Sequence, residues 1–328
     1  MKHLIRQSII LLAVLVVLPL SGALVQAATS WDMPTPYPDA TFHTKNIAQF
    51  AADVEKATGG KLVIKLHTAG SLFKHPEIKN AVRGGQVPIG EFFVSLLGNE
   101  HPVFSADSQP FLATNYEDAA KLWAAQKPII TKLLDKQGLM PLFSVPWPPQ
   151  GLYTKKAIEN VDDIKGLKFR TYNSTLEKLA NKLGAAPTQV EVPDLPQAFS
   201  TGRVDAMITS PSTGANSKAW DFVNTYTDIQ AWVPKNVVVV NKKAFRRLDK
   251  EVQQAVLEAA AAAEKRGWDM SKEETAAKIK IMADNGMNIV TPSPELMSGL
   301  KAIGDQIVVE WEKEGGAEST ELLKAYRQ

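Results

Sequence analysis

The chain has 328 residues, of which 37 are basic, 35 are acidic and none is cysteine. The lack of cysteine excludes disulfides, thiolate zinc sites and cysteine nucleophiles. Basic and acidic residues nearly balance, which excludes the clustered basic excess typical of proteins that bind nucleic acids.

The first 27 residues have the pattern of a secretory signal peptide. Lys2 and Arg6 form a basic start, an apolar run extends from Ile9 to Leu20, and Val25 and Ala27 are small residues suited to a signal peptidase. The apolar run is shorter than the roughly 20 residues needed to cross a bilayer, so a membrane anchor is the less favoured alternative. We therefore expect export to the periplasm, with cleavage after about Ala27.

The segments that follow alternate between helical and strand-like patterns, which is typical of an α/β protein. Residues 40–58 place their apolar side chains on one helical face, and residues 61–67 alternate apolar and polar side chains as a half-buried strand does. A second helix is predicted over residues 75–83, and a short apolar segment follows over residues 87–94.

The middle of the chain contains two segments that we expect to cross between domains. A helix over residues 115–136, with Asn115 or Thr114 as its N-cap, precedes the first of them. This first crossing, residues 139–153, is apolar but interrupted by four prolines, so it cannot lie wholly inside a sheet. The second crossing is predicted over residues 232–241, and two such crossings imply a hinge between two domains.

The C-terminal part is predicted to be helical. One pattern runs from Asp249 to Asp284 and is long enough either to break near Gly267 or to brace both domains. Residues 293–326 indicate two further helices.

These crossings predict the domain boundaries. The first domain comprises residues 28–147 and about 236–275, and the second comprises residues 148–235 and about 276–328.

A search for catalytic and cofactor motifs finds none. The chain lacks the nucleophile elbow GxSxG, the zinc motif HExxH, a P-loop and the dinucleotide fingerprint GxGxxG. Its histidines do not have the spacing of metal ligands. We expect no enzymatic activity, no cofactor and no metal, although an exported enzyme of unknown chemistry remains an alternative.

The segment VDDIKGLKFR, residues 161–170, ends on an arginine that directly follows an apolar strand. From spacing alone, Arg170 would be expected to extend into solvent. The segment is similar, however, to the "DLKGLKIR" strand of the DctP-type solute receptors of tripartite ATP-independent periplasmic (TRAP) transporters. In that family the arginine binds the carboxylate of the substrate.

Further motifs resemble this family and occur in its order between residues 57 and 248. Each motif is weak alone, but together they are specific. They are TGGKL at residues 58–62, GSL at 70–72, GQVPIG at 85–90, GRVDA at 202–206 and NKKAF at 241–245.

The resemblance implies a periplasmic binding protein fold, in which a ligand cleft lies between two α/β domains, crossing strands form the hinge and a long helix braces both. It also implies a receptor that captures a small organic carboxylate and delivers it to a TRAP membrane permease driven by an ion gradient. We expect a monomer without nucleic-acid partners. A receptor that signals to a membrane sensor would share every motif and stays open as an alternative.

The chain departs from the family at two positions of the expected site. Many members carry a second arginine about twenty residues before the first, where this chain has Gln150. Where members have an asparagine that holds the carboxylate, this chain has Thr209 followed by Ser210. Arg170 is therefore the predicted main anchor, with Thr209 or Ser210 as the second partner. Asn173 matches a position that often lines the cleft.

Aromatic residues gather near the expected cleft. The candidate wall residues are Phe92, Phe93, Trp147, Tyr153, Tyr172 and Trp220. About half of them, Phe92 or Phe93 among them, are expected in the core. One positive anchor with several aromatic side chains predicts a monocarboxylate with an apolar or aromatic body. Glu91 is expected either to accept a hydroxyl or amine of the ligand or to be a surface carboxylate.

Overall fold

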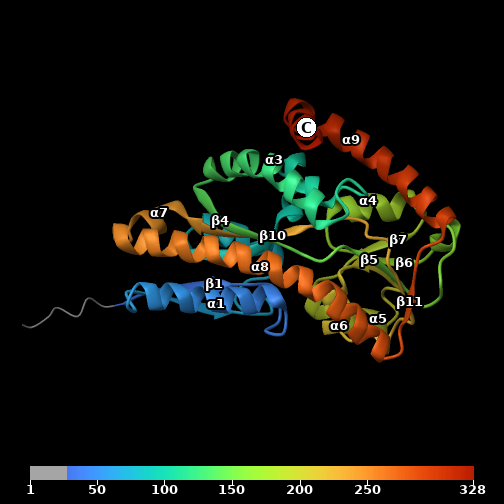
Figure 1. Cartoon of the computed structure of the whole chain (residues 1–328), viewed down its shortest axis with the longest axis horizontal. Coiled ribbons are helices and arrows are strands. Elements are labelled where there is room, and N and C mark those ends of the chain that lie inside the picture. Colours follow the sequence, from blue (N-terminus) through green and yellow to red (C-terminus); the bar gives the residue numbers. More distant parts are fainter. Residues whose placement is uncertain (1–27) are drawn as a thin grey trace, which may run out of the picture.

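The computed structural model describes residues 28–328, and the predicted signal peptide lies outside the described residues. The chain forms two lobes (Figure 1). We define the first lobe by the sheets β1-β2 and β3-β10-β4, and the second by the six-stranded sheet β11-β9-β5-β8-β6-β7. In the described part of the chain, no helix is long and apolar enough to cross a membrane.

The first lobe contains the helices and strands predicted for the N-terminal part. Asn115 caps α3, since its side chain accepts a hydrogen bond from the backbone N–H of Asp118. The sequence analysis missed β1, which pairs in parallel with β2. The elements of this lobe are β1 (Thr29–Pro34), α1 (Phe42–Ala57), β2 (Leu62–His67), α2 (His75–Arg83), β3 (Ile89–Phe93), α3 (Tyr116–Asp135), β4 (Leu139–Pro146), β10 (Lys235–Asn241) and α7 (Lys242–Arg246).

The second lobe is built around three parallel strands. β6 lies between β7 and β8 and runs parallel to both, whereas β5 pairs antiparallel with β8 and β9. Its elements are β5 (Gly151–Thr154), β6 (Lys168–Thr171), α4 (Ser174–Lys182), β7 (Ala186–Gln189), α5 (Leu195–Ser200), β8 (Ala206–Thr209), α6 (Pro211–Asn216), β9 (Thr225–Thr227) and β11 (Asn288–Val290).

The two predicted crossing segments lie side by side. The backbone N–H of Trp147 donates to the carbonyl of Pro234 at 2.8 Å, and that of Gln150 donates to the carbonyl of Trp232 at 3.0 Å. The N–H of Ala231 in turn donates to the carbonyl of Gln150 at 2.9 Å. The lobes are therefore joined by a pair of hydrogen-bonded strands, as a hinge requires.

Helix α8 (Lys250–Asp284) runs unbroken along both lobes (Figure 1). It packs against α1 and β4 of the first lobe and against α6 and β11 of the second. The expected brace is thus confirmed, and the alternative of a break at Gly267 is wrong. A Cβ atom on Gly267 would lie 2.4 Å from a methyl carbon of Val145 and 2.7 Å from the side-chain nitrogen of Asn46. This glycine lets the helix approach the sheet closely.

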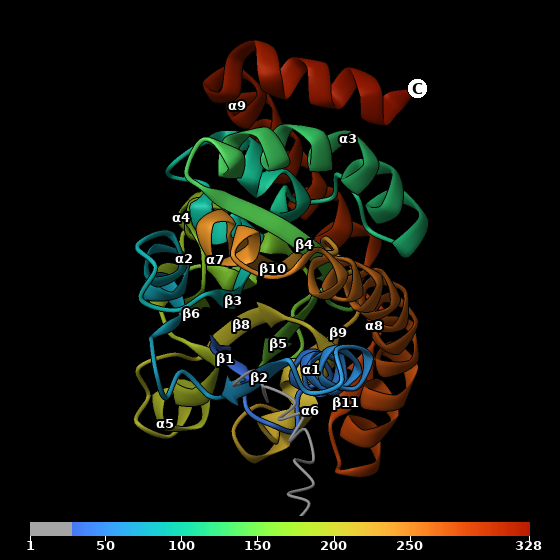
Figure 2. The ribbon, with the colours of Figure 1, turned by 90° about the vertical axis from the view of Figure 1, so that its left-hand side faces the viewer.

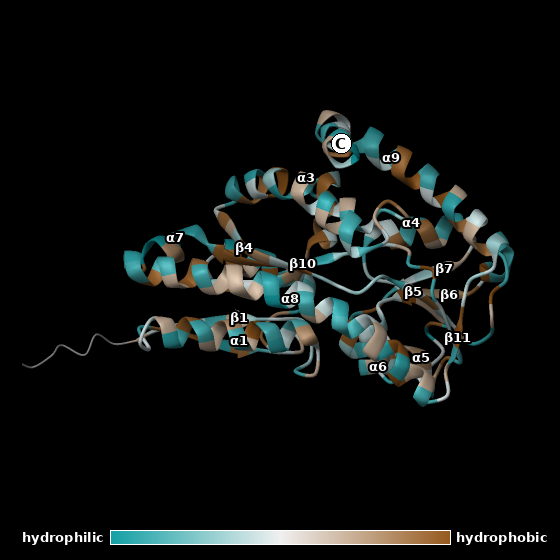
Figure 3. Cartoon of the chain, viewed as in Figure 1, coloured by the Kyte–Doolittle hydropathy of each residue, from teal (hydrophilic) through white to brown (hydrophobic). Residues whose placement is uncertain are grey.

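Helix α9 (Pro294–Arg327) is two helices joined at Gly316, whose φ of 56° is non-helical, as predicted. It contacts α4 of the second lobe and α3 of the first, and Figure 2 shows it lying over α3. Because α9 touches both lobes, the assignment of residues 276–328 to the second domain stays a prediction. Hydrophilic and hydrophobic residues alternate along α8 and α9 (Figure 3), as expected of helices with one buried face.

Replacement of Gly267 by alanine tests this close approach. Alanine is the better helix former by about 1 kcal/mol. We nevertheless expect Gly267→Ala to lower the free energy of unfolding by about 1–3 kcal/mol, because its methyl group overlaps with Val145. Urea denaturation measures the change. The matched control Ala262→Gly, on the exposed side of α8, should cost about 1 kcal/mol. A Gly267→Ala variant more stable than the parent would contradict the close packing.

Candidate ligand-binding site

A cavity with about 390 Å³ of empty space, its mouth included, lies between the two lobes. Its lining comes from both lobes and from the first crossing segment. The lining residues are Tyr37, His75, Phe93, Trp147, Gln150, Arg170, Tyr172, Glu191, Val192, Thr209, Ser210 and Thr213.

Arg170 lies near the carboxyl end of β6, and its side chain is 2% exposed. The carboxyl ends of parallel strands are the usual position for ligand-binding residues in α/β sheets. The Nε of Arg170 donates to the carbonyl of Val190 at 2.9 Å, and its guanidinium carbon lies 4.7 Å from the centre of the Tyr172 ring. No other hydrogen bond of the guanidinium occurs within residues 28–328. The two terminal nitrogens are thus left for a ligand.

Arg170 and Glu191 both line the cavity, and they form no ion pair with each other in the described chain. Burial lowers the pKa of Arg170 from its usual range, but an arginine remains a cation in proteins. Burial alone would raise the pKa of Glu191, but the hydrogen bond from His75 and the charge of Arg170 hold it below its ordinary value. The cavity therefore carries one positive and one negative group.

The side chain of Gln150, which occupies the position of a family arginine, forms hydrogen bonds with two neighbours. Its Nε2 donates to the carbonyl of Pro148 at 2.7 Å, and its Oε1 accepts from the hydroxyl of Tyr172 at 3.3 Å. The same Tyr172 hydroxyl accepts from the indole N–H of Trp232 at 3.1 Å. Gln150 therefore fixes the wall of the cavity and adds no charge to it.

Three hydroxyl-bearing residues that line the cavity, Thr209, Ser210 and Thr213, lie at the end of β8, the strand beside β6, and in the first turn of α6. The Oγ of Ser210 accepts from the backbone N–H of Thr213 at 3.0 Å and donates to the Oγ1 of Thr213 at 3.2 Å. Ser210 is thus occupied in capping α6. Thr213 keeps its own hydroxyl proton, so Thr209 and Thr213 are the better hydrogen-bond donors for a ligand.

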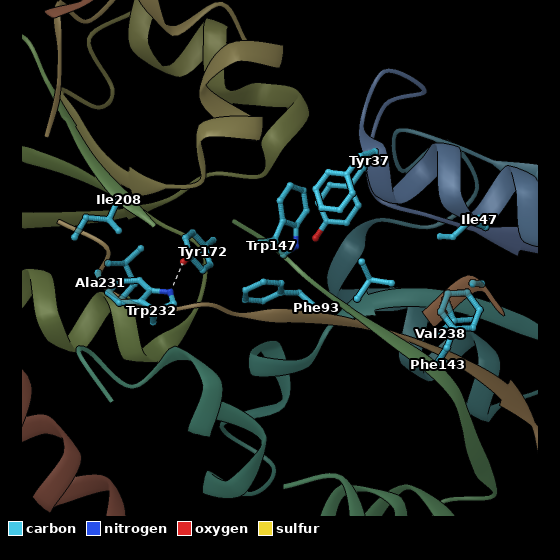
Figure 4. Packing of buried hydrophobic residues seen from close by; sticks show 14 of the residues in the cluster. Tyr37, Ile47, Phe93, Phe143, Trp147, Tyr172, Ile208, Ala231, Trp232 and Val238 are labelled. Atoms are coloured by element: carbon cyan, nitrogen blue, oxygen red, sulfur yellow. Dashed lines mark hydrogen bonds between the residues drawn. The ribbon is translucent and has the colours of Figure 1, made fainter. Parts of the chain in front are cut away.

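Four aromatic rings form the walls (Figure 4). Tyr37 and Trp147 meet edge to face with ring centres 5.0 Å apart, and Phe93 and Tyr172 meet in the same way at 5.4 Å. Such contacts add to the stability that burial provides. Together with Val192, these rings form the apolar part of the lining.

A buried polar chain holds two of these rings from behind. The Oδ1 of Asn236 accepts from the indole N–H of Trp147 at 2.9 Å and from the hydroxyl of Tyr37 at 3.2 Å. Its Nδ2 donates to Glu91 at 2.8 Å, and the hydroxyl of Thr35 donates to the other oxygen of Glu91 at 2.5 Å. Glu91 is 2% exposed, so the expectation of a surface carboxylate is wrong.

Six of the residues predicted from sequence line the cavity, namely Arg170, Gln150, Trp147, Tyr172, Thr209 and Ser210.

Four others do not line it, each for a physical reason. Glu91 belongs to the polar chain behind the wall, and Phe92 points away from Phe93 because neighbouring strand residues face opposite sides. Asn173 caps α4 and donates to Ser95 of the first lobe at 2.7 Å. Trp220 packs against a separate hydrophobic cluster of the second lobe.

Phe93, which the sequence offered together with Phe92, also lines the cavity. Five lining residues were not predicted, because they lie in segments without a recognisable motif: Tyr37, His75, Glu191, Val192 and Thr213. One signal was available for Glu191. It follows β7 by two residues, and β7 is the parallel neighbour of the strand that carries Arg170. Adjacent parallel strands end at the same edge of a sheet.

Among the described residues there is no cluster of three or more potential metal ligands.

Comparison with known proteins relates the chain to a family of solute-binding proteins and to solved receptors. The family model of the bacterial extracellular solute-binding proteins of family 7, DctP, matches residues 35–314. DctP7 of Bordetella pertussis, an extracytoplasmic solute receptor that binds pyroglutamic acid, is 48% identical; the match covers 92% of this chain and 100% of that one, with a TM-score of 0.91.

Two further structures are similar. DctP6 of Bordetella pertussis, which also binds pyroglutamic acid, is 45% identical with a TM-score of 0.90, and 91% of this chain and 99% of that chain are covered. A TRAP solute-binding protein from a marine metagenome, specific for pyroglutamate, is 40% identical with a TM-score of 0.89, and 92% and 99% are covered.

The buried carboxyl of Glu91 generates a pH-dependent prediction. Burial raises its pKa from 4.5 to about 7, so the folded protein binds this proton more tightly than the unfolded chain. Stability from this group is therefore full below pH 4.5 and falls as the pH rises toward 7. We expect Glu91→Gln, which can keep both hydrogen bonds, to gain about 2–3 kcal/mol relative to the parent between pH 5 and pH 8.

Urea denaturation at the two pH values measures this gain. The control is Asp205→Asn. In the parent protein, a hydrogen bond from Lys155 lowers the pKa of the Asp205 carboxyl. That carboxylate is ionised in both states throughout the range, so the control should keep the pH dependence of the parent. If the free energy of unfolding changed with pH by the same amount in Glu91→Gln and in the parent, Glu91 would not be the source of the pH dependence.

Proposed function

The chain belongs to the DctP family of bacterial extracellular solute-binding proteins, family 7, and on that premise we propose that its ligand is pyroglutamate or a closely similar cyclic monocarboxylate. As a member, it is a solute receptor of the TRAP type and not an enzyme. The observation that carries the proposal is one buried arginine, with both terminal nitrogens available, in a narrow aromatic cavity.

The charge of the cavity favours a ligand with a single carboxylate. The planar guanidinium of Arg170 can donate two parallel hydrogen bonds to one carboxylate. It is the only arginine or lysine that lines the cavity within residues 28–328, since Gln150 is neutral. A second carboxylate would face no cation and would meet the negative charge of Glu191.

The walls favour a small flat ring. Pyroglutamate is a five-membered lactam with one carboxylate, one ring N–H and one ring carbonyl. The aromatic rings of Tyr37, Trp147, Phe93 and Tyr172 can cover the faces of this ring. The hydroxyl of Thr209 or Thr213 can donate to the ring carbonyl.

This proposal narrows the expectation of an apolar or aromatic ligand body. Three similar receptors, at 40–48% identity, bind pyroglutamate, whose ring has a polar edge. The hydroxyls and Glu191 provide polar partners for such an edge, which a purely aromatic acid would leave unpaired.

We further propose that the receptor is exported by its signal peptide, binds its ligand in the periplasm as a monomer and delivers it to a TRAP permease. The family supports this assignment, since its members act outside the cytoplasm.

Substitution of Arg170 tests the proposed function. Arg170→Ala and Arg170→Lys should weaken binding of pyroglutamate by about 2–5 kcal/mol, because the ligand carboxylate would lose its bidentate partner. Isothermal titration calorimetry with the purified protein measures the loss. Thermal unfolding without ligand should show that both variants remain folded.

Arg203→Ala is the matched control. Arg203 lies in the same lobe and also donates to a carbonyl, that of Gln189 at 3.2 Å, but on the surface. We expect this variant to bind as the parent does. Unchanged binding by Arg170→Ala, or no binding of pyroglutamate to the parent protein, would refute the proposal.

A further inference from the structure

We infer that Glu191 is a specificity-determining residue that accepts the ring N–H of the ligand, so that the cavity selects carboxylates with an N–H donor beside the carboxylate-bearing carbon. This inference rests on the proposed function and assigns its selectivity to one side chain.

His75 holds Glu191 in place across the cavity. The Nε2 of His75 faces the backbone N–H of Phe93 at 3.0 Å and must accept that hydrogen bond. A neutral histidine that accepts at one nitrogen carries its proton on the other. The Nδ1–H of His75 therefore donates to the Oε2 of Glu191 at 3.2 Å. A first-lobe histidine thus fixes the orientation of a second-lobe carboxylate at the rim of the cavity.

The second oxygen of Glu191 is the acceptor left for a ligand. Within residues 28–328, the only hydrogen-bond donor to this oxygen, Oε1, is the side-chain Nε2 of Gln189, at the long distance of 3.5 Å. Gln150 already accepts from Tyr172 and Ser210 already accepts from Thr213, and the remaining hydroxyls of the lining are neutral. Within residues 28–328, Glu191 is therefore the only carboxylate acceptor of the lining.

Glu191 lies near Arg170 in the cavity, as the ring N–H lies near the carboxylate in pyroglutamate. Arg170 donates to the carbonyl of Val190, the residue that precedes Glu191, so the backbone places both side chains in one region. The two charged groups form no ion pair with each other in the described chain, although each contributes to the electrostatics of the other. A ligand whose N–H is one carbon away from its carboxylate can contact both.

The Glu191 carboxylate distinguishes ligands with an N–H donor from ligands without one in two ways, by attraction and by repulsion. An N–H donor forms a charge-assisted hydrogen bond with Glu191, which is about twice as strong as a neutral one. A ligand with a methylene there leaves this partly buried acceptor unpaired, and a ligand with an oxygen there places two acceptors together. Sites built to bind a polar hydrogen reject analogues that lack it far more strongly than apolar pockets reject a size change.

The test compares pyroglutamate with its carbocyclic analogue, in which a methylene group replaces the ring N–H. Calorimetry on the parent protein should show pyroglutamate binding at least about tenfold more tightly. Glu191→Ala should lose affinity for pyroglutamate but not for the analogue, so the ratio falls toward one. Glu191→Gln keeps an oxygen acceptor without charge and should give an intermediate ratio.

The matched control is Glu318→Ala, which removes another glutamate paired with a histidine, His101, outside the cavity. It should keep the parent ratio. Equal affinity of the parent protein for pyroglutamate and for the analogue would overturn the inference. Equal losses of affinity for both ligands in the folded Glu191 variants would also overturn it. Either outcome would leave the proposed function intact. Binding of neither ligand to the parent would overturn the proposed function and the inference with it.

Discussion

The structure depends on one constraint, the burial of an arginine without an ionic partner in contact. Arg170 is 2% exposed, and the only hydrogen bond of its guanidinium within the described chain goes to a backbone carbonyl. A buried charge that is not fully paired destabilises the protein by several kcal/mol. In the function proposed above, a ligand carboxylate supplies the missing partner, so that ligand binding would also stabilise the protein around Arg170.

Other lining residues give the space around Arg170 its shape. Trp147 and Tyr37 are held by one amide, Asn236, and that amide is oriented by the buried Glu91. The chain of hydrogen bonds joins β3 and β10 to the segments that follow β1 and β4, so Asn236, Glu91 and Thr35, which do not line the cavity, hold its wall in shape. Fully satisfied buried networks of this kind hold side chains in one arrangement.

The sequence predicted the two-lobe α/β fold and half of the cavity lining, because these parts depend on periodic patterns and on the motif that ends at Arg170. It did not predict Tyr37 or His75, which reach the cavity from first-lobe segments distant in sequence. Phe92 and Phe93 were both candidates, because alternation gives two faces of a strand but does not say which faces the ligand, and the structure places Phe93 in the lining and Phe92 in the core. Glu91 was predicted as a contact, and burial among polar partners places it behind the wall.

The crossing segments have a consequence for the entropy of closure. Prolines 146, 148, 149 and 234 lie in the two segments that join the lobes, and each fixes its own φ angle near −65°. A rotation of one lobe against the other therefore has few backbone torsions available. If a ligand closes the lobes, as the proposed function implies, an open form with these prolines would sample fewer orientations than a glycine-rich connection would allow. The proline content of the connection would then favour binding although no proline lines the cavity.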